Sequence, residues 1–375
     1  MRADLIPALD PAPIPGPPAL LVLLWIVTFF LHLLCVNAAL GGAIVPALLP
    51  AAIPGGRRRT VALFFAEVNS WALSLAITFA IAPLLFLQVL YGRFFYTASI
   101  LIAPAWLGLL VLLMLGYYLN WIAKFRLRAG KDATAVLALS AVLYLLIAGI
   151  QTAVHLISVQ PSLWSVFLAR PSLVLWDPAF LPRFLHVVFA AVSMAAILPA
   201  AFPKALGGAS AEAARFGLFV ALVLTGGQFA VGLWLVGVLP PPVLAGLMTG
   251  GIAKMAPLGI GILTGLALLG LLVRAAGATG NVRPAVVVLG HFAAAAFFMV
   301  VTRHQVRDLY LAAARSNEKE DVAPQWGVLA LFLAVFIAVA AYHNKVETQI
   351  HRLRQWKQIK HTHLARIALD WANIP

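Results

Sequence analysis

The chain is poor in charged residues, and above all in acidic ones. Only 10% of its 375 residues are charged, with 12 Asp and Glu in all, whereas 63% are hydrophobic and the mean hydropathy is +0.99. Soluble globular domains carry about 25% charged residues, so this composition excludes that class. It is typical of a protein whose helices cross a lipid bilayer several times.

The chain also has very little cysteine. Its one cysteine, Cys35, lies within the first apolar stretch. A single thiol excludes a disulfide framework, a thiolate metal site and a covalently attached c-type haem. The net charge of +14 does not indicate nucleic-acid binding, because the basic residues gather in the loops beside apolar stretches. We therefore expect the lipid bilayer, and no nucleic acid, among its partners.

Nine apolar stretches are each long enough to cross a bilayer, which takes about 20 residues at about 1.5 Å per residue. We predict that all are helices, because lipid offers no partner to unpaired backbone groups. The predicted spans are 19–49, 60–90, 97–123, 133–158, 180–202, 214–238, 243–273, 284–303 and 325–343. The predicted fold class is all-α, a polytopic membrane protein of about nine transmembrane helices with short loops.

Basic residues are divided unequally between the two sets of loops. Most of them follow the first, third, fifth, seventh and ninth predicted spans, beginning with Arg57, Arg58 and Arg59. The positive-inside rule then places the N-terminus outside and the C-terminus in the cytoplasm of a cell inner membrane. We expect a Pro-rich extracytoplasmic segment at 1–18 and a transmembrane domain at 19–343. Residues 344–375 are expected to form a basic amphipathic helix, on the membrane surface or against a partner protein.

Four motifs occur in a characteristic order along the chain. TFFLHLLCVNAALGG contains His32, SLAITFAIAPLLFLQVLYGRFFYTASI includes most of the second span, RFLHVVFAAVSMAA contains His186 and IAKMAPLGIG contains Met255. In order and spacing these motifs resemble subunit I of the cytochrome bd-type quinol oxidases, over roughly residues 20–310. The resemblance implies a haem b cofactor, in one to three copies.

The resemblance also implies a set of haem ligands. His32 would bind the iron of a deeper haem, and His186 with Met255 would be the axial pair of a low-spin haem b. Imidazole and thioether are good iron ligands, and a haem held by two protein groups transfers electrons with no open position for substrate. Met255 reaches the height of His186 only if the seventh span begins near Thr249 or breaks at Gly250 and Gly251.

Three further histidines are candidates by their depth. His291 and His32 both lie roughly 20 Å below the outer surface, so they could share one haem. His155 and His304 lie at the height of His186, where either could replace the methionine. Each of these histidines could instead be a hydrogen-bond donor between helices.

Charged residues near these histidines suggest supporting roles. Arg303, Arg307 and Asp308 could hold haem propionates or a quinone head group at the outer face, although a solvated helix end explains them equally well. Glu67 is the one acidic residue clearly within a span. It could accept a hydrogen bond from His291 or form an ion pair with Lys254.

Parts of the oxidase machinery have no counterpart in this sequence. The eighth span lacks the family's haem-ligating glutamate, no acid-lined proton route is present, and VLPPP stands where the family has its long quinol-binding loop. We therefore expect a b-type cytochrome subunit of an oxidoreductase complex rather than an oxygen-reducing enzyme. It would relay electrons between the quinone pool and an extracytoplasmic c-type cytochrome or iron-sulfur protein, alongside other membrane subunits.

Three alternatives remain open at this stage. The chain could be a haem-free scaffold subunit derived from an oxidase, or a divergent terminal oxidase with an unfamiliar ligand set. It could also be a transporter, with Glu67 and Lys254 as the coupling groups.

Overall fold

The computed structural model describes residues 6–8, 12–49, 55–277, 282–315 and 321–328, and several positions between 330 and 341. The chain divides into two units, the first made of 1–12 and 18–320 and the second of 13–17 and 321–375. In the second unit Ile14 and Val322 form a short parallel bridge, and the Ile14 amide donates to the Asp321 carbonyl at 2.8 Å. The helical bundle belongs to the first unit.

Eight helices in the described part are long and apolar enough to cross a membrane. They are α1 (Pro18–Ile44), α2 (Gly55–Leu101), α3 (Ala103–Arg128), α4 (Thr134–Val159), α6 (Phe180–Ala201), α7 (Ser210–Gly237), α9 (Ile252–Gly277) and α10 (Val282–Arg315). The predicted all-α, polytopic membrane fold is thereby confirmed. Much of the ninth predicted span, 325–343, and the whole tail, 344–375, lie outside the described residues.

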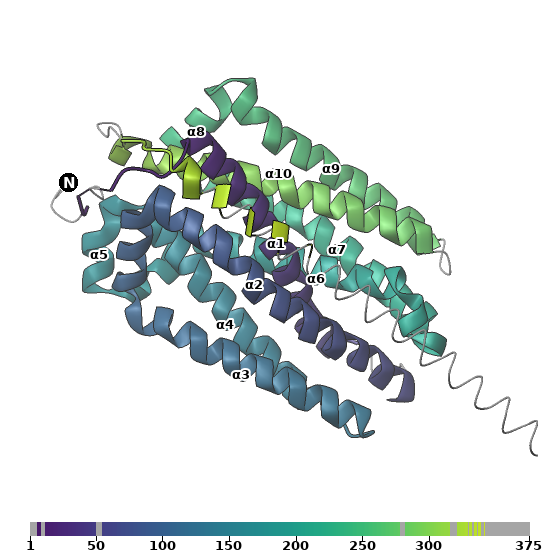
Figure 1. The fold of residues 1–375 in the computed structure, drawn as a ribbon. Coiled ribbons are helices and arrows are strands. Elements are labelled where there is room, and N and C mark those ends of the chain that lie inside the picture. Colours follow the sequence, from purple (N-terminus) through teal and green to yellow (C-terminus); the bar gives the residue numbers. More distant parts are fainter. Residues whose placement is uncertain are drawn as a thin grey trace, which may run out of the picture. The chain divides into compact units, whose positions relative to one another are not determined.

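The long helices form two groups of four (Figure 1). In the first group α1 packs against α2 and α3 against α4, and in the second α6 packs against α7 and α9 against α10. Contacts of α6 with α1 and α4, and of α10 with α1, join the two groups. Side chains of α1, α4, α6 and α10 therefore meet in the interior of the first unit.

Several helix boundaries differ from the sequence prediction: α1 ends at Ile44 rather than 49, α3 begins at Ala103 rather than 97, and α10 continues to Arg315 rather than ending at 303. The second span was expected to end at residue 90, but α2 continues to Leu101 through a kink at Tyr91, where φ is −139° and ψ is 24°. The turn after the kink buries Phe94, Phe95 and Ala98 in an apolar cluster, and this burial explains why the segment stays helical.

The seventh predicted span, 243–273, is two helices. A short α8 (Pro241–Thr249) ends at Gly250, and α9 begins at Ile252. Gly251 between them has a φ of +83°, a left-handed conformation that favours glycine. The break at the glycine pair places Met255 in the first turn of α9, near one end of the bundle.

Glycine allows the closest helix contacts in the two groups. A Cβ atom added at Gly41 would overlap the backbone carbonyl of Ala191, which joins α1 to α6. A Cβ atom at Gly217 would overlap the carbonyl of Ala196, which joins α7 to α6. In lipid, where helices gain little from hydrophobic burial, such close backbone approach is a main source of packing energy.

Replacing Gly217 with alanine should therefore destabilise the bundle. We expect the free energy of unfolding in detergent to fall by about 1–3 kcal/mol, the usual cost of overpacking. Gly226→Ala, on the same helix and with nothing within 4 Å of the added Cβ, is the matched control and should be neutral or slightly stabilising. Equal thermal unfolding midpoints for the two variants would contradict the role of this contact.

Candidate functional site

Most of the predicted site residues lie at one end of the first unit. This end, called the histidine end below, is formed by the start of α1, the kink of α2, the end of α4, the start of α6 and the end of α10. His304 of α10 lies 5.5 Å from the Trp25 ring of α1, measured between ring centroids, and 6.4 Å from the Tyr91 ring of α2. Segments far apart in the sequence therefore meet there.

Asp308 is the centre of a polar network at the histidine end. Its carboxylate accepts a 2.5 Å hydrogen bond from the Tyr91 hydroxyl and lies 3.3 Å from His304 Nε2 and 3.9 Å from Arg315 Nη1. The Arg307 guanidinium lies over the rings of Trp25 and Tyr91, at 4.7 and 5.0 Å from their centroids. These contacts hold the kink of α2 against α1 and α10.

His304 has polar contacts at both ring nitrogens. Nε2 faces Asp308, and Nδ1 lies 3.4 Å from the Tyr91 hydroxyl. Because an iron ligand needs one nitrogen with a free lone pair, these contacts favour a role for His304 in the polar network. Its expected role as an alternative haem ligand gains no support from this geometry.

His32 has the arrangement that suits a metal ligand. Its Nδ1 donates to the backbone carbonyl of Ala76 on α2 at 2.9 Å, so Nε2 is the nitrogen that keeps its lone pair. Metal-ligating histidines generally have their other ring nitrogen fixed in this way. The ring lies 6.2 Å from the Phe29 ring, measured between centroids, and Phe29 in turn stacks on Trp25 at 5.2 Å and has the Arg303 guanidinium 5.1 Å from its centroid.

His155 and His186 belong to a buried group that is rich in positive charge. Arg183, Arg303 and Arg307 each act electrostatically on His155, which is only 6% exposed. His186 lies three residues after Arg183 on α6. Within the described residues, Nδ1 of both histidines, Nε of Arg183 and Arg303, and Nη1 of Arg307 are buried without a hydrogen-bond partner.

Two carboxylates act on these arginines, but both have other partners. Asp177 accepts hydrogen bonds from Gln160 Nε2 and from the Ala179 amide, each at 2.8 Å. Asp308 is engaged by Tyr91 and His304. In the described part of the chain, the charges acting on Arg303 are those of Arg307 and Arg183. The group could therefore hold an anion, and the two propionates of a haem fit this chemistry.

Met255 and His291 lie apart from these contacts. Met255 is 45% exposed, in the first turn of α9, where the carbonyl of Ala253 accepts a 2.9 Å hydrogen bond from Gln305 Nε2. His291 is partly buried, and its Nδ1 donates to the Val287 carbonyl of its own helix at 3.0 Å. The pairing of Met255 with His186, and of His291 with His32, stays a prediction.

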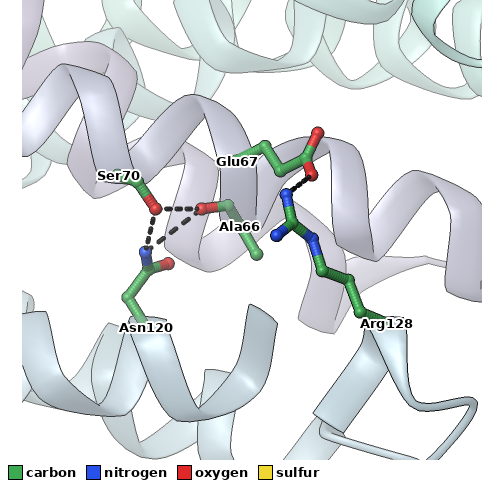
Figure 2. A network of polar contacts seen from close by, with 5 residues as sticks. All are labelled: Ala66, Glu67, Ser70, Asn120 and Arg128. Carbon is green, nitrogen blue, oxygen red and sulfur yellow. Dashed lines mark hydrogen bonds and ion pairs between the residues drawn. The ribbon is translucent and has the colours of Figure 1, made fainter. Parts of the chain in front are cut away.

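The expected partners of Glu67 are wrong. Its carboxylate forms an ion pair with Arg128 at 2.6 Å, and its side chain is 43% exposed. Figure 2 shows this pair beside the buried Asn120, which donates to the Ala66 carbonyl and to Ser70 Oγ. Lys254 was chosen because counting over one unbroken span, 243–273, gave it the depth of Glu67, whereas α9 begins at Ile252 and Lys254 lies in its first turn, near Gln305 of α10.

Sequence reasoning missed three residues of the histidine end. The sequence motifs indicated no role at this site for Tyr91, Arg183 or Trp25. Two signals were available: Arg183 precedes His186 by three residues, and Trp25, Phe29 and His32 follow one another at helical spacing. Either pattern places the residues on one face of a helix.

Comparison with models of known protein families gave no match, and comparison with curated proteins gave none either. Within the described residues no three His, Cys, Asp or Glu side chains gather closely enough to hold a metal ion by themselves. The assignment of the site therefore depends on the geometry of the chain itself.

The hydrogen bond between Tyr91 and Asp308 can be tested by removing one hydroxyl. We expect Tyr91→Phe to lower the free energy of unfolding by about 1–2 kcal/mol, because the hydroxyl donates to a charged group. The control is Tyr118→Phe on α3, where the side chain is 63% exposed. If thermal unfolding in detergent shows the same change for both variants, the network does not stabilise the kink.

Proposed function

We propose that this chain is a membrane-embedded b-type cytochrome subunit that relays electrons between the quinone pool and a redox partner. The observation that carries the proposal is the buried group of histidines and arginines at the histidine end. Its buried nitrogen atoms without a protein partner suit a ligand that offers both carboxylates and a metal centre. Haem b is such a ligand, and when bound it supplies a one-electron carrier.

The roles of the individual residues follow from their chemistry. His32 would offer Nε2 to iron, because the Ala76 carbonyl occupies its Nδ1. His186 would be a ligand of a second haem, with Met255 or His155 as its partner. Arg183, Arg303 and Arg307 would bind propionates through their buried N–H groups.

The position of the site supports an extracytoplasmic electron partner. The basic loops with Arg57, Arg58 and Arg59 are at the opposite end of the bundle, and the positive-inside rule assigns that end to the cytoplasm. The histidine end would then face the side where a c-type cytochrome or an iron-sulfur protein can dock.

A transporter is less well supported. That alternative needs Glu67 and Lys254 to be coupled charges inside the membrane, whereas Glu67 is partly exposed and paired with Arg128. A haem-free scaffold and a divergent oxidase remain as outcomes of the experiment that follows.

The purified protein should show sharp low-spin b-type bands in a dithionite-reduced minus oxidised spectrum. His186→Ala should remove the low-spin signal and His32→Ala should reduce haem content, because each loses an axial ligand. His304→Gln is the control and should retain the bands, since its ring already has other partners. Unchanged haem content in both ligand variants would overturn the ligand assignment. A colourless wild-type protein would favour the haem-free scaffold, and a shift of the reduced spectrum on addition of carbon monoxide would favour an oxidase.

Removing a positive charge beside the haem should lower its reduction potential, because cations favour the reduced iron over the oxidised one. We expect the midpoint potential of Arg307→Gln to be more negative than that of the wild type in a spectroscopic redox titration. The control is Arg57→Gln at the opposite end, whose partner is Glu212. A potential that is unchanged by Arg307→Gln would place this arginine away from the haem.

A further inference from the structure

A pocket of about 370 Å³ lies at the end of the bundle opposite to the histidine end, called the basic end below. It is bounded by the segment after α1, the start of α2, the end of α3 and the start of α4. Its apolar part is made of well-buried side chains, among them Ala62, Leu127 and Leu137. Its polar part carries Arg58, Arg59 and Lys131.

The basic residues of this end differ in whether they have partners. Several outside the pocket are engaged: Arg57 with Glu212 at 2.5 Å, Arg128 with Glu67 at 2.6 Å, and Arg126 with the Asp132 carbonyl at 2.8 Å. Lys124 lies over the Trp121 ring, 4.5 Å from its centroid. These four cations are therefore less available to an outside ligand.

What distinguishes Arg58, Arg59 and Lys131 is that they line one pocket, whereas Lys204, Arg215 and Arg274, which also have no partner among the described residues, lie outside it. Within the described residues, the side chains of Arg58 and Lys131 have no hydrogen-bond or ion-pair partner. Arg59 has one long contact, 3.4 Å from its Nη1 to the Gly130 carbonyl. Positive charge that the protein does not neutralise is thus concentrated in the pocket.

The one carboxylate in the pocket lining forms no ion pair with these cations, because its oxygens are bound by Thr134 at the start of α4. Asp132 Oδ1 accepts from the Thr134 hydroxyl at 2.8 Å, and Oδ2 accepts from the Thr134 amide at 3.3 Å. These contacts are typical of a carboxylate at a helix N-terminus.

We propose that this pocket binds a phosphate group, and that the group belongs to the headgroup of an anionic phospholipid. Arg58, Arg59 and Lys131 would surround the phosphate, which is the anion that clusters of Lys and Arg at a membrane surface select. The apolar side of the pocket suits the glycerol and upper acyl carbons of a lipid. A soluble phosphate is also an anion, but it has no group to place against Ala62, Leu127 and Leu137.

This lipid site does not depend on the proposed function, because it is formed by different residues at the other end of the bundle. It would fix the ends of α2, α3 and α4 to the membrane surface. Lipid composition would then affect the stability of the protein without any change at the histidine end.

Native mass spectrometry of the full chain in detergent can test the site. Dioleoylphosphatidylglycerol, added in steps, should bind with one tight site that dioleoylphosphatidylcholine does not fill. Arg58→Gln/Lys131→Gln should bind the anionic lipid more weakly, by roughly fivefold for each charge removed. The control, Arg57→Gln/Arg215→Gln, has the same net charge and lies outside the pocket, so its tight site should be unchanged.

A second measurement separates the two sources of phosphate. Inorganic phosphate could raise the thermal unfolding midpoint of the wild type but not that of Arg58→Gln/Lys131→Gln. If phosphatidylglycerol also fails to bind tightly, the pocket binds phosphate from solution rather than a lipid. Equal loss of lipid binding in the pocket variant and its control, or no tight site in the wild type, would overturn the proposal. Whatever the outcome of the lipid experiments, the spectra of the histidine variants test the haem assignment separately.

Discussion

The structure depends on how buried guanidinium charges are neutralised inside an apolar helical bundle. Moving a charge from water to a protein interior costs several kcal/mol even after relaxation, so such a group needs a partner of opposite charge. At the histidine end, Asp177 and Asp308 are shared with Gln160, Tyr91 and His304, while Arg303 is acted on by other arginines. Aromatic rings offset part of this cost for Arg303 and Arg307. A dianionic ligand would offset more of it.

The two ends of the bundle follow the same electrostatic rule. At the basic end, Arg57 and Arg128 are paired with carboxylates, and three other cations, Arg58, Arg59 and Lys131, line one pocket. At the histidine end, the buried arginine atoms without partners lie beside histidines that come from separate helices. At both ends the basic side chains outnumber the carboxylates that could neutralise them among the described residues. Each end therefore suits an anionic ligand of its own. The haem and lipid proposals are therefore independent in their residues but share one physical argument.

Hydropathy was sufficient to predict the fold, because a spanning helix is defined by length and composition. The spans predicted at 133–158 and 180–202 agree within a residue with α4 and α6. The kink at Tyr91 and the break at Gly250 and Gly251 were harder to predict from the sequence. Both depend on local contacts and backbone conformation rather than on average hydropathy. The partner of Glu67 was missed for a related reason: the unpredicted break moves Lys254 into the first turn of α9, and the direction of the Glu67 side chain depends on the neighbouring α3, which supplies Arg128.

The histidines illustrate why the site was only partly predictable. Sequence places His32 and His291 within predicted spans at one depth and His304 just beyond the end of a span, at the height of His186, but depth alone does not show which of them can bind iron. Their hydrogen bonds separate them: His32 is fixed by a carbonyl of another helix, His291 by a carbonyl of its own, and His304 by a carboxylate and a phenol. A bond to another helix fixes both the tautomer and the direction in which Nε2 points, whereas a bond within one helix leaves that direction to the helix alone. His32 is therefore the histidine whose surroundings come closest to those of a preorganised metal ligand.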